Sequence, residues 1–469
     1  MSLDHSTFMS PFSWRYGSAD MRRIWSEEHK RVLMRRIWLA LARAQQAAGL
    51  VTAEQVADLE DHVQAVDIDR AQAIERETRH DVMAEIQAYA EQCTIGGRII
   101  HWGATSADIT DNVDVLRMRE ASLLLRQRLG DLLEVFAGKI EQTAGLSVMA
   151  YTHIQPAEPT TLGYRFAVYA QDLLEDYKQL GHLLGDLRGK GLKGAVGTQA
   201  SFQQILESTN MSAEEMEAAA MESLGLPYFT IATQTYTRQQ DLRVQQVLAG
   251  IAASLHKFAF DFRLMQSPVY GEWAEPFRKK QVGSTAMPFK RNPISSENIC
   301  SLARYVAGLP AVAWNNASQA VLERSLDDSA NRRIFQAEGF LAVDEIVART
   351  TRIVREMIIN EQAIARNMAQ YGPFAATERV LMALVEAGAG RQEAHEWLRQ
   401  VSLQAWATVQ DGKDNPLPRL LGEEERISRY LNTDQIQILM DSTAHTGTAS
   451  SRAITLANTI HETITKDIS

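Results

Sequence analysis

The positions of the prolines set the strongest limit on what this chain can fold into. No proline occurs between Pro11 and Pro156 or between Pro310 and Pro373. A proline in a helix interior costs about 3 kcal/mol, because its ring removes a hydrogen-bond donor and clashes with the preceding turn. Both spans can therefore hold long helices.

Apolar residues spaced three or four positions apart predict three long helices, over residues 112–145, 160–188 and 235–266. Each would be about 45 Å long if it has about 30 residues. The apolar stripes of the first and third helices consist of Leu125, Leu129, Leu132, Phe136 and Ile140, and of Leu248, Ile251, Leu255, Phe258 and Phe262.

Strand patterns are scarce, and the best candidates are the short stretches 98–102 and 228–233. The chain is therefore predicted to be mainly α. Apolar and small residues spread around more than one face of the long helices, which favours burial by partner subunits and predicts a helix-bundle oligomer. Polar or caplike stretches suggest three parts, an N-terminal helical domain at 1–111, a central bundle at 112–358 and a C-terminal helical domain at 359–469.

Composition disfavours several classes of function. The formal net charge of −10 disfavours a nucleic-acid partner, which requires a broad basic face. No apolar run approaches the roughly 20 residues that span a bilayer, and the N-terminus does not resemble a secretion signal. Two cysteines cannot form a disulfide framework. These features predict a cytoplasmic protein without a membrane partner, and local basic clusters leave room for a small anionic ligand.

The segment 278–293 reads RKKQVGSTAMPFKRNP and cannot be one continuous helix, since it contains a glycine and two prolines. Gly283 permits backbone conformations closed to other residues, and the amides that follow it can form an anion-binding nest beside Lys290. A solvated basic loop is the alternative interpretation, and the residues alone leave both open.

Eleven consecutive residues, GSTAMPFKRNP, resemble the signature loop of the fumarase and aspartase superfamily, which runs Gly-Ser-Ser-x-x-Pro-x-Lys-x-Asn. Thr285 replaces the second serine. The resemblance implies a three-domain fold with a central bundle of long helices that forms a homotetrameric core. It also implies elimination of fumarate from a succinyl adduct, with Ser284 as the general base and with Lys290 and Asn292 binding the substrate.

Three histidines lie in polar, irregular segments: His80 in RHDVMAE, His101 in HWGATSADITDN and His153 in YTHIQPAEPTT. A lone histidine is more often structural than catalytic. Within the superfamily, however, these segments resemble motifs of the adenylosuccinate lyase family. That resemblance implies that His153 is the general acid, that Glu297 orients it, and that His80 holds the substrate phosphate or assists proton transfer. The role of His101 stays open.

The same resemblance covers nearly the whole chain and implies further substrate-binding residues. They are Arg15, Tyr16, Arg79, Asp81, Thr105, Ser106, Gln234, Arg324, Ser329 and Arg333. Arginine suits this role because its forked donors grip phosphate in a bidentate manner.

Several of these positions have structural alternatives. Thr105 and Ser106 are also typical of turns and helix caps. Asp327 and Asp328 are suited to capping a helix that begins near Ser329, and the pair Arg332 and Arg333 is typical of a solvated face. One departure from the family concerns position 298, where some members have a substrate-contacting arginine and this chain has asparagine.

The resemblance implies cleavage of adenylosuccinate to AMP and fumarate, and of succinyl-aminoimidazole-carboxamide ribotide to the carboxamide ribotide and fumarate. No metal is implied, since the histidines show no ligand spacing such as HExxH, and no organic cofactor is implied, since no Walker or GxGxxG motif occurs. Rival interpretations are a carboxymuconate cycloisomerase or an argininosuccinate lyase, whose substrates lack the phosphate that Arg15, Arg324 and Arg333 would bind. A catalytically silent relative is a further rival. It is disfavoured by the joint presence of the four residues Ser284, His153, Lys290 and Glu297.

Overall fold

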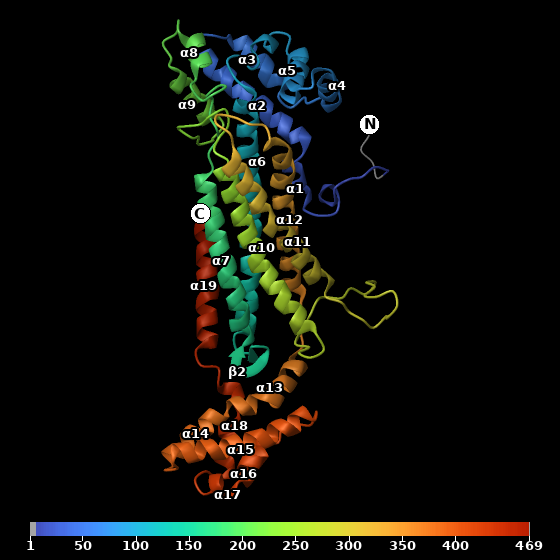
Figure 1. Ribbon diagram of the computed structural model, residues 1–469, viewed down its shortest axis with the longest axis vertical. Coiled ribbons are helices and arrows are strands. Elements are labelled where there is room, and N and C mark those ends of the chain that lie inside the picture. The colour runs from blue at the N-terminus through green and yellow to red at the C-terminus, as the bar shows by residue number, and fades with distance from the viewer. Residues whose placement is uncertain (1–5, 469) are drawn as a thin grey trace. The chain divides into compact units, whose positions relative to one another are not determined.

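The computed structural model describes residues 6–468, and within them helices predominate. Five helices of 25 to 38 residues form the main bundle (Figure 1). They are α6 (Ser106–Thr143), α7 (Leu162–Asp186), α10 (Gln239–Gln266), α11 (Ile294–Gln319) and α12 (Ser329–Glu356). Between residues 6 and 468, no helix combines the length and the apolar character needed to cross a membrane.

The three long helices expected from apolar spacing are confirmed as α6, α7 and α10, with ends that differ by at most six residues from those predicted. All ten residues of the two predicted stripes are almost completely buried. In α6 and α10, for example, the rings of Phe136 and Phe258 meet edge to face with centroids 5.4 Å apart. The apolar period therefore identified the buried faces correctly.

Prolines proved to be weaker boundaries than expected. Pro310 lies inside α11, and Pro373 lies inside α13 (Glu361–Ala375). Each helix therefore continues through its proline despite the missing hydrogen bond.

The chain divides into two compact units, each containing segments of all five long helices. The first unit comprises 1–129, 176–253 and 302–347. Apart from the long helices it contains η1 (Pro11–Ser13), α1 (Ala19–Ile24), α2 (Glu27–Ala47), α3 (Ala53–His62), α4 (Ile68–Thr78), α5 (Asp81–Gln92), η2 (Gly97–Ile99), α8 (Ala200–Leu206) and α9 (Ala213–Ser223). Helices α2, α8 and α9 share a small apolar core around Leu41, Phe202 and Met216.

The second unit comprises 130–175, 254–301 and 348–469. Its further elements are β1 (Ser147–Thr152), β2 (Gln155–Thr161), β3 (Trp273–Ala274), β4 (Ile358–Ile359), α13, α14 (Thr377–Glu386), α15 (Arg391–Gln410), α16 (Leu417–Glu423), α17 (Glu425–Ser428), α18 (Thr433–Met440), η3 (Ser442–Ala444) and α19 (Ala449–Ile468). Helices α14 to α18 share one apolar core and lie together in Figure 1. The three-part division at residues 111 and 358 stays a prediction.

Both predicted strands are wrong. Residues 98–102 form the end of η2 and a turn, and within 228–233 only Tyr228 makes an isolated bridge, to Gly189. Instead, β1 and β2 form an antiparallel hairpin, and β3 pairs with β4. The error has a clear cause: an alternation of five or six residues is too short to distinguish a strand from an irregular segment.

The N-terminal segment is fastened to α12 through backbone amides. The amide of Gly17 donates to Glu345 Oε2 (3.0 Å), and that of Ser18 donates to Asp344 Oδ2 (2.7 Å). Gly17 has φ +75°, and a Cβ atom there would lie 2.7 Å from Leu341 Cδ2. The positive φ therefore favours glycine, and an added Cβ would also force the Leu341 side chain to shift.

We expect Gly17→Ala to destabilise the protein by about 1–3 kcal/mol, because alanine is strained at positive φ and its Cβ would clash with the Leu341 side chain. Thermal or denaturant unfolding measures this. Gly49→Ala is the matched control, since Gly49 has φ +79° but no atom within 4 Å of its added Cβ. If both variants lose the same stability, contact with Leu341 contributes nothing and only the backbone conformation matters.

Candidate active site

One cavity of about 630 Å³ in the first unit is lined by nine of the residues that the sequence singled out. These are Arg79, His80, Asp81, Thr105, Ser106, Gln234, Arg324, Ser329 and Arg333. They come from four separate stretches of the chain, so their convergence is a property of the fold. We call this space the substrate cavity.

His80 lies at the junction of α4 and α5 and caps α5. Its Nδ1 accepts a hydrogen bond from the backbone amide of Met83 (3.2 Å). When Nδ1 accepts, the proton of a neutral imidazole is on Nε2, which is then a donor for a ligand. Neighbouring Asp81 forms an ion pair with Arg333 of α12 (3.1 Å), while Arg79 ends α4 in the left-handed conformation with φ 56°.

Thr105 and Ser106 occupy the start of α6. The carbonyl of Thr105 accepts from the amide of Asp108 (2.9 Å), and the amide of Thr105 donates to Asp108 Oδ2 (2.9 Å). The carboxylate of Asp108 is itself held by Lys190 in a buried ion pair of 2.5 Å. The helix-cap and ligand-binding interpretations are thus compatible, since a helix N-terminus that borders a cavity favours an anion.

The alternative of a solvated face for Arg332 and Arg333 is wrong for Arg332, whereas the side chain of Arg333 is exposed. The Arg332 guanidinium is buried; it contacts Asp241 (2.7 Å) and Asp114 (3.1 Å) and donates to the hydroxyl of Tyr236 (2.8 Å). Burial raises the pKa of Asp114, and Arg332 opposes that rise. Adjacent arginines on a helix point to different sides, so the pair could not be treated as one face.

A largely buried charge cluster, three members of which also line the substrate cavity, was not predicted from the sequence. Its members are Asp111, Asp114, Tyr236, Arg238, Asp241, Asp328 and Arg332. One signal was available, because acidic residues inside otherwise apolar stretches of long helices need buried partners. Nothing in the sequence identified which arginines those partners are.

His101, whose role was left open, does not line the substrate cavity. Its Nδ1 accepts a hydrogen bond from Trp38 Nε1 (3.0 Å), and burial lowers its pKa. The ring is therefore neutral at physiological pH and supports the fold between α2 and α6.

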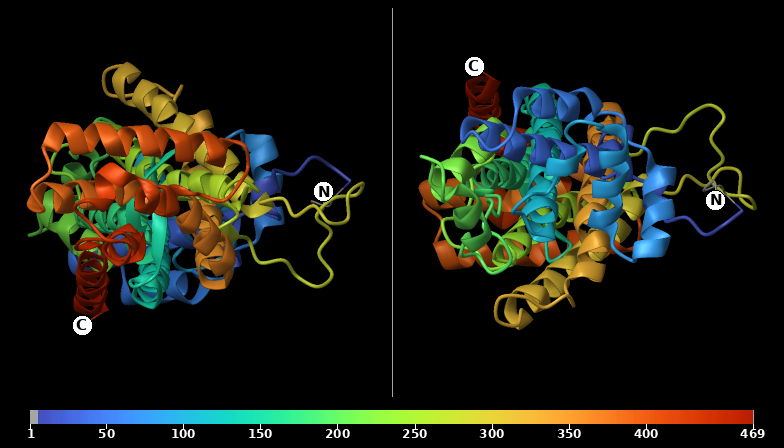
Figure 2. Two further views of the ribbon diagram at one scale, coloured as in Figure 1. Left: turned by 90° about the horizontal axis from the view of Figure 1, so that it is seen from below. Right: turned by 90° about the horizontal axis from the view of Figure 1, so that it is seen from above.

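Ser284 lies in the second unit, in the segment 278–293, which has neither helix nor strand (Figure 2). Its Oγ accepts hydrogen bonds from the amides of Ala286 (3.3 Å) and Met287 (3.1 Å). Asn292 Nδ2 donates to the carbonyl of Gly283 (3.2 Å), and the amide of Lys290 donates to the carbonyl of Met287 (3.0 Å).

Glycine at position 283 is required by a close backbone approach. A Cβ there would lie 2.0 Å from the carbonyl oxygen of Lys290. The loop thus folds back on itself, and two of the amides that follow Gly283 donate to the serine oxygen. The side chain of Lys290 is exposed.

His153 lies at the tip of the β1–β2 hairpin and is exposed. It has φ 54°, and Ile154 has φ 61°. A left-handed β-branched residue is unusual and costs about 1–2 kcal/mol, so the tip is held in a strained conformation. Glu297, in the first turn of α11, is also exposed; across residues 6–468 no hydrogen bond or ion pair joins it to His153.

Arg15 and Tyr16 are in the first unit but do not line the substrate cavity. The Arg15 guanidinium lies 5.8 Å from the ring of Trp14 and 5.9 Å from that of Tyr16.

Among the described residues, one group of side chains has the spacing of a metal site: Asp58, His62 and Cys93. Hydrogen bonding already accounts for its geometry. Asp58 Oδ2 accepts from the amides of Ile95 (2.7 Å) and Gly96 (2.8 Å), and burial raises the pKa of the Cys93 thiol to about 12. None of the three residues lines the substrate cavity.

Comparison with known proteins identifies the family. The family described as Lyase matches residues 14–308, and that described as Adenylosuccinate lyase C-terminus matches residues 373–453. Adenylosuccinate lyase of Saccharomyces cerevisiae is 37% identical over 90% of this chain and 88% of its own length. The Archaeoglobus fulgidus adenylosuccinate lyase is 34% identical over 97% of this chain and 99% of its own length.

Among solved structures, the 3-carboxy-cis,cis-muconate lactonizing enzyme of Pseudomonas putida aligns with a TM-score of 0.84 at 25% identity, covering 96% of this chain and 99% of that one. A fumarate lyase from Mesorhizobium sp. BNC1 aligns with a TM-score of 0.82 at 22% identity, over 96% of this chain and 99% of its own. The mainly helical superfamily fold expected from the signature loop is confirmed. Sequence identity over almost the whole length, together with the matching C-terminal domain, then selects one branch of this fold: the chain belongs to the adenylosuccinate lyase family.

Proposed function

We propose that this chain cleaves adenylosuccinate to AMP and fumarate, and succinyl-aminoimidazole-carboxamide ribotide to the carboxamide ribotide and fumarate. The observation that carries the proposal is the substrate cavity, in which nine of the residues expected from the family converge. Family membership over almost the whole chain supports the same reaction. Both substrates carry a ribose phosphate and a succinyl group, so the site must bind several anions.

The substrate cavity supplies donors for these anions. Arg324 and Arg333 offer forked donors for the phosphate, and Ser329, the first residue of α12, adds a hydroxyl at a helix N-terminus. Thr105 and Ser106 offer the N-terminus of α6 to a carboxylate. An incoming phosphate would take over Arg333 from Asp81, whose ion pair with it is partly exposed and therefore weak.

In the proposed reaction, Ser284 Oγ removes a proton from the carbon next to a succinyl carboxylate. The electron pair first moves into that carboxylate and then forms the carbon–carbon double bond as the carbon–nitrogen bond breaks. His153 gives the departing nitrogen a proton. The doubly negative intermediate requires donors fixed in advance, for which Lys290 and Asn292 are placed in the same loop.

A serine hydroxyl is a weak base at neutral pH unless its alkoxide is stabilised. The two amide donors on Ser284 Oγ act in that direction, because hydrogen bonds to the charged form favour it. The same contacts also form a common serine turn, so they support the role without requiring it.

The active form is proposed to be a cytoplasmic homotetramer whose sites combine residues from different subunits. Two observations support sharing. His153 and Glu297 are both exposed, without a bond between them in the part of the chain described. Large apolar side chains are also exposed on the long helices, as at Phe260, Tyr305 and Trp314, which favours burial by other copies of the chain. No metal or organic cofactor takes part in the proposed reaction.

The rival within the superfamily is lactonisation of a carboxymuconate, given the likeness to the Pseudomonas putida enzyme. A direct assay separates the two. We expect purified protein to change the ultraviolet absorbance of adenylosuccinate and to release AMP and fumarate in equal amounts. Folded protein that leaves adenylosuccinate intact would refute the proposal, and turnover of a carboxymuconate by the same sample would establish the rival.

A second assay tests whether position 298 affects the preference between the two substrates. Where some family members have an arginine, this chain has a shorter neutral side chain, so the relative preference for the two substrates is open. We expect Asn298→Arg to change the ratio of kcat/KM for the two substrates, because a cation there can contact the succinyl or ribotide group differently. An unchanged ratio would show that position 298 does not contact substrate.

A further inference from the structure

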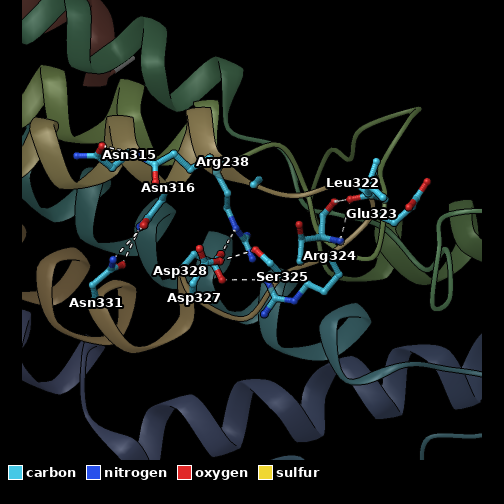
Figure 3. A pocket seen from close by; sticks show the side chains of 14 residues that line it. Arg238, Asn315, Asn316, Leu322, Glu323, Arg324, Ser325, Asp327, Asp328 and Asn331 are labelled. Atoms are coloured by element: carbon cyan, nitrogen blue, oxygen red, sulfur yellow. Dashed lines mark hydrogen bonds and ion pairs between the residues drawn. The ribbon is translucent and has the colours of Figure 1, made fainter.

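Asp328, the residue immediately before α12, lies between two arginines in the first unit. Its Oδ1 accepts a hydrogen bond from Arg324 Nη1 (3.0 Å), and its Oδ2 accepts one from Arg238 Nε (2.7 Å), as Figure 3 shows. The side chain is buried, with 6% of the residue exposed. Both carboxylate oxygens are thus used, and neither faces water freely.

Arg238 is held in turn from the other side. Its two terminal nitrogens donate to the two oxygens of Asp111 on α6, at 3.0 and 3.2 Å. Asp111 also accepts from the backbone amide of Tyr236 (2.9 Å). Alternating charges therefore run from α6 to the loop before α12, through Asp111, Arg238, Asp328 and Arg324. Bidentate contact and burial make such a chain geometrically rigid.

Asp328 is ionised in this position. Burial alone would raise its pKa, but Arg238, Arg332 and Arg324 outweigh burial and lower it. A carboxylate that carries full charge at neutral pH can hold an arginine side chain in one direction. The direction matters here, because Arg324 borders two cavities.

The second cavity has a volume of about 200 Å³ and lies beside the substrate cavity, with Arg324 lining both. Its walls include the amide side chains of Asn315, Asn316 and Asn331, where Asn316 and Asn331 exchange hydrogen bonds of 2.7 and 3.0 Å (Figure 3). Asp328 also lines this second cavity, so its contact with Arg324 fixes the guanidinium where the two cavities meet.

We propose that Asp328 is a positioning residue that fixes the Arg324 guanidinium at the wall of the substrate cavity. The inference rests on the proposed function, in which Arg324 binds the ribose phosphate of the substrate. Asp328 acts through Arg324 and does not itself touch substrate, since it is absent from the lining of the substrate cavity. The backbone of Asp328 adds to this role, as its carbonyl accepts from the amide of Arg332 and starts α12 with Ser329 at its tip.

The test compares Asp328→Asn with Asp327→Asn. Asparagine keeps the size of the side chain but loses the charge and one acceptor. We expect Asp328→Asn to raise KM for adenylosuccinate about tenfold while kcat stays within about twofold, as expected for lost ground-state binding. Asp327 is exposed and bonds only to Ser325 among the described residues, so its variant should behave as wild type.

A double-mutant cycle then distinguishes positioning from general support of the fold. Arg324→Met should raise KM by itself, and adding Asp328→Asn to it should change KM little further, because the group through which Asp328 acts is gone. Additive effects of the two changes would overturn the inference. So would an unchanged KM for Asp328→Asn when Arg324→Met raises KM.

If the proposed role of Arg324 in substrate binding is wrong, the same experiments give a different result. If Arg324→Met leaves KM unchanged, Arg324 does not bind substrate and the inference falls with that assignment. Should Asp328→Asn fail to fold because Arg238 loses its partner, Asp328→Glu retains the charge and shifts its position, and the same rise in KM is expected. A crystal structure of either variant provides a direct readout: we expect the Arg324 side chain displaced from the position it has beside Asp328, and an unmoved side chain would refute the role.

Discussion

Replacing Ser284 with alanine should reduce kcat for adenylosuccinate about 10³-fold, within the range of about 10²–10⁴-fold attributed to a positioned acid or base. The reason is specific to this hydroxyl. It accepts two backbone amides within a loop that also contains Lys290 and Asn292, so it is the group in the loop best placed to remove a carbon-bound proton. Initial rates at saturating substrate measure the effect.

The neighbouring hydroxyl provides the control. Thr285→Ser alters a side chain one position away, restores the second serine of the superfamily pattern, and should leave kcat within about twofold. Substrate binding should persist in Ser284→Ala, because the phosphate contacts lie in the substrate cavity of the first unit. A Ser284→Ala enzyme that releases fumarate at wild-type speed would remove Ser284 from the mechanism and leave the reaction without its proposed base.

Sequence patterns predicted the bundle well for a physical reason. Burying one face of a long helix imposes a period of three to four on its apolar residues, and Leu125 to Ile140 in α6 follow it without exception. Short elements impose no such period. The β1–β2 hairpin was missed because its tip consists of His153 and Ile154 at positive φ, where a turn is normally marked by glycine or asparagine.

The substrate cavity shows the same division between local and long-range information. Residues that the family motif places next to each other, such as Arg79, His80 and Asp81, were predicted from sequence and do line the cavity. The buried ion pairs that support the cavity were not predicted from the sequence. The pairing of Arg238 with Asp111 joins residues 127 positions apart, and only the tertiary fold of the first unit brings them together.

His153→Ala is expected to lower kcat about 10²–10⁴-fold, since the departing nitrogen would leave without a proton. The imidazole at the hairpin tip is exposed, so an added small donor such as free imidazole can reach the vacated position and should restore part of the rate. His395→Ala, at an exposed histidine of α15 far from every proposed site residue in sequence, serves as the control. Unchanged kcat in His153→Ala would transfer the acid role to another group, with His80 the first to be tested.

Mixing the two inactive variants tests whether sites are shared between subunits. Ser284→Ala and His153→Ala lie in different segments, so hybrid oligomers should contain some sites with both native residues and should regain activity. A mixture of Ser284→Ala with Lys290→Ala should regain none, because both defects lie in the one loop and every site receives a damaged copy. Recovery in the first mixture alone requires that the loop and the hairpin tip of one site come from different chains. If neither mixture regains activity although mass spectrometry confirms subunit exchange, each chain forms its active site alone.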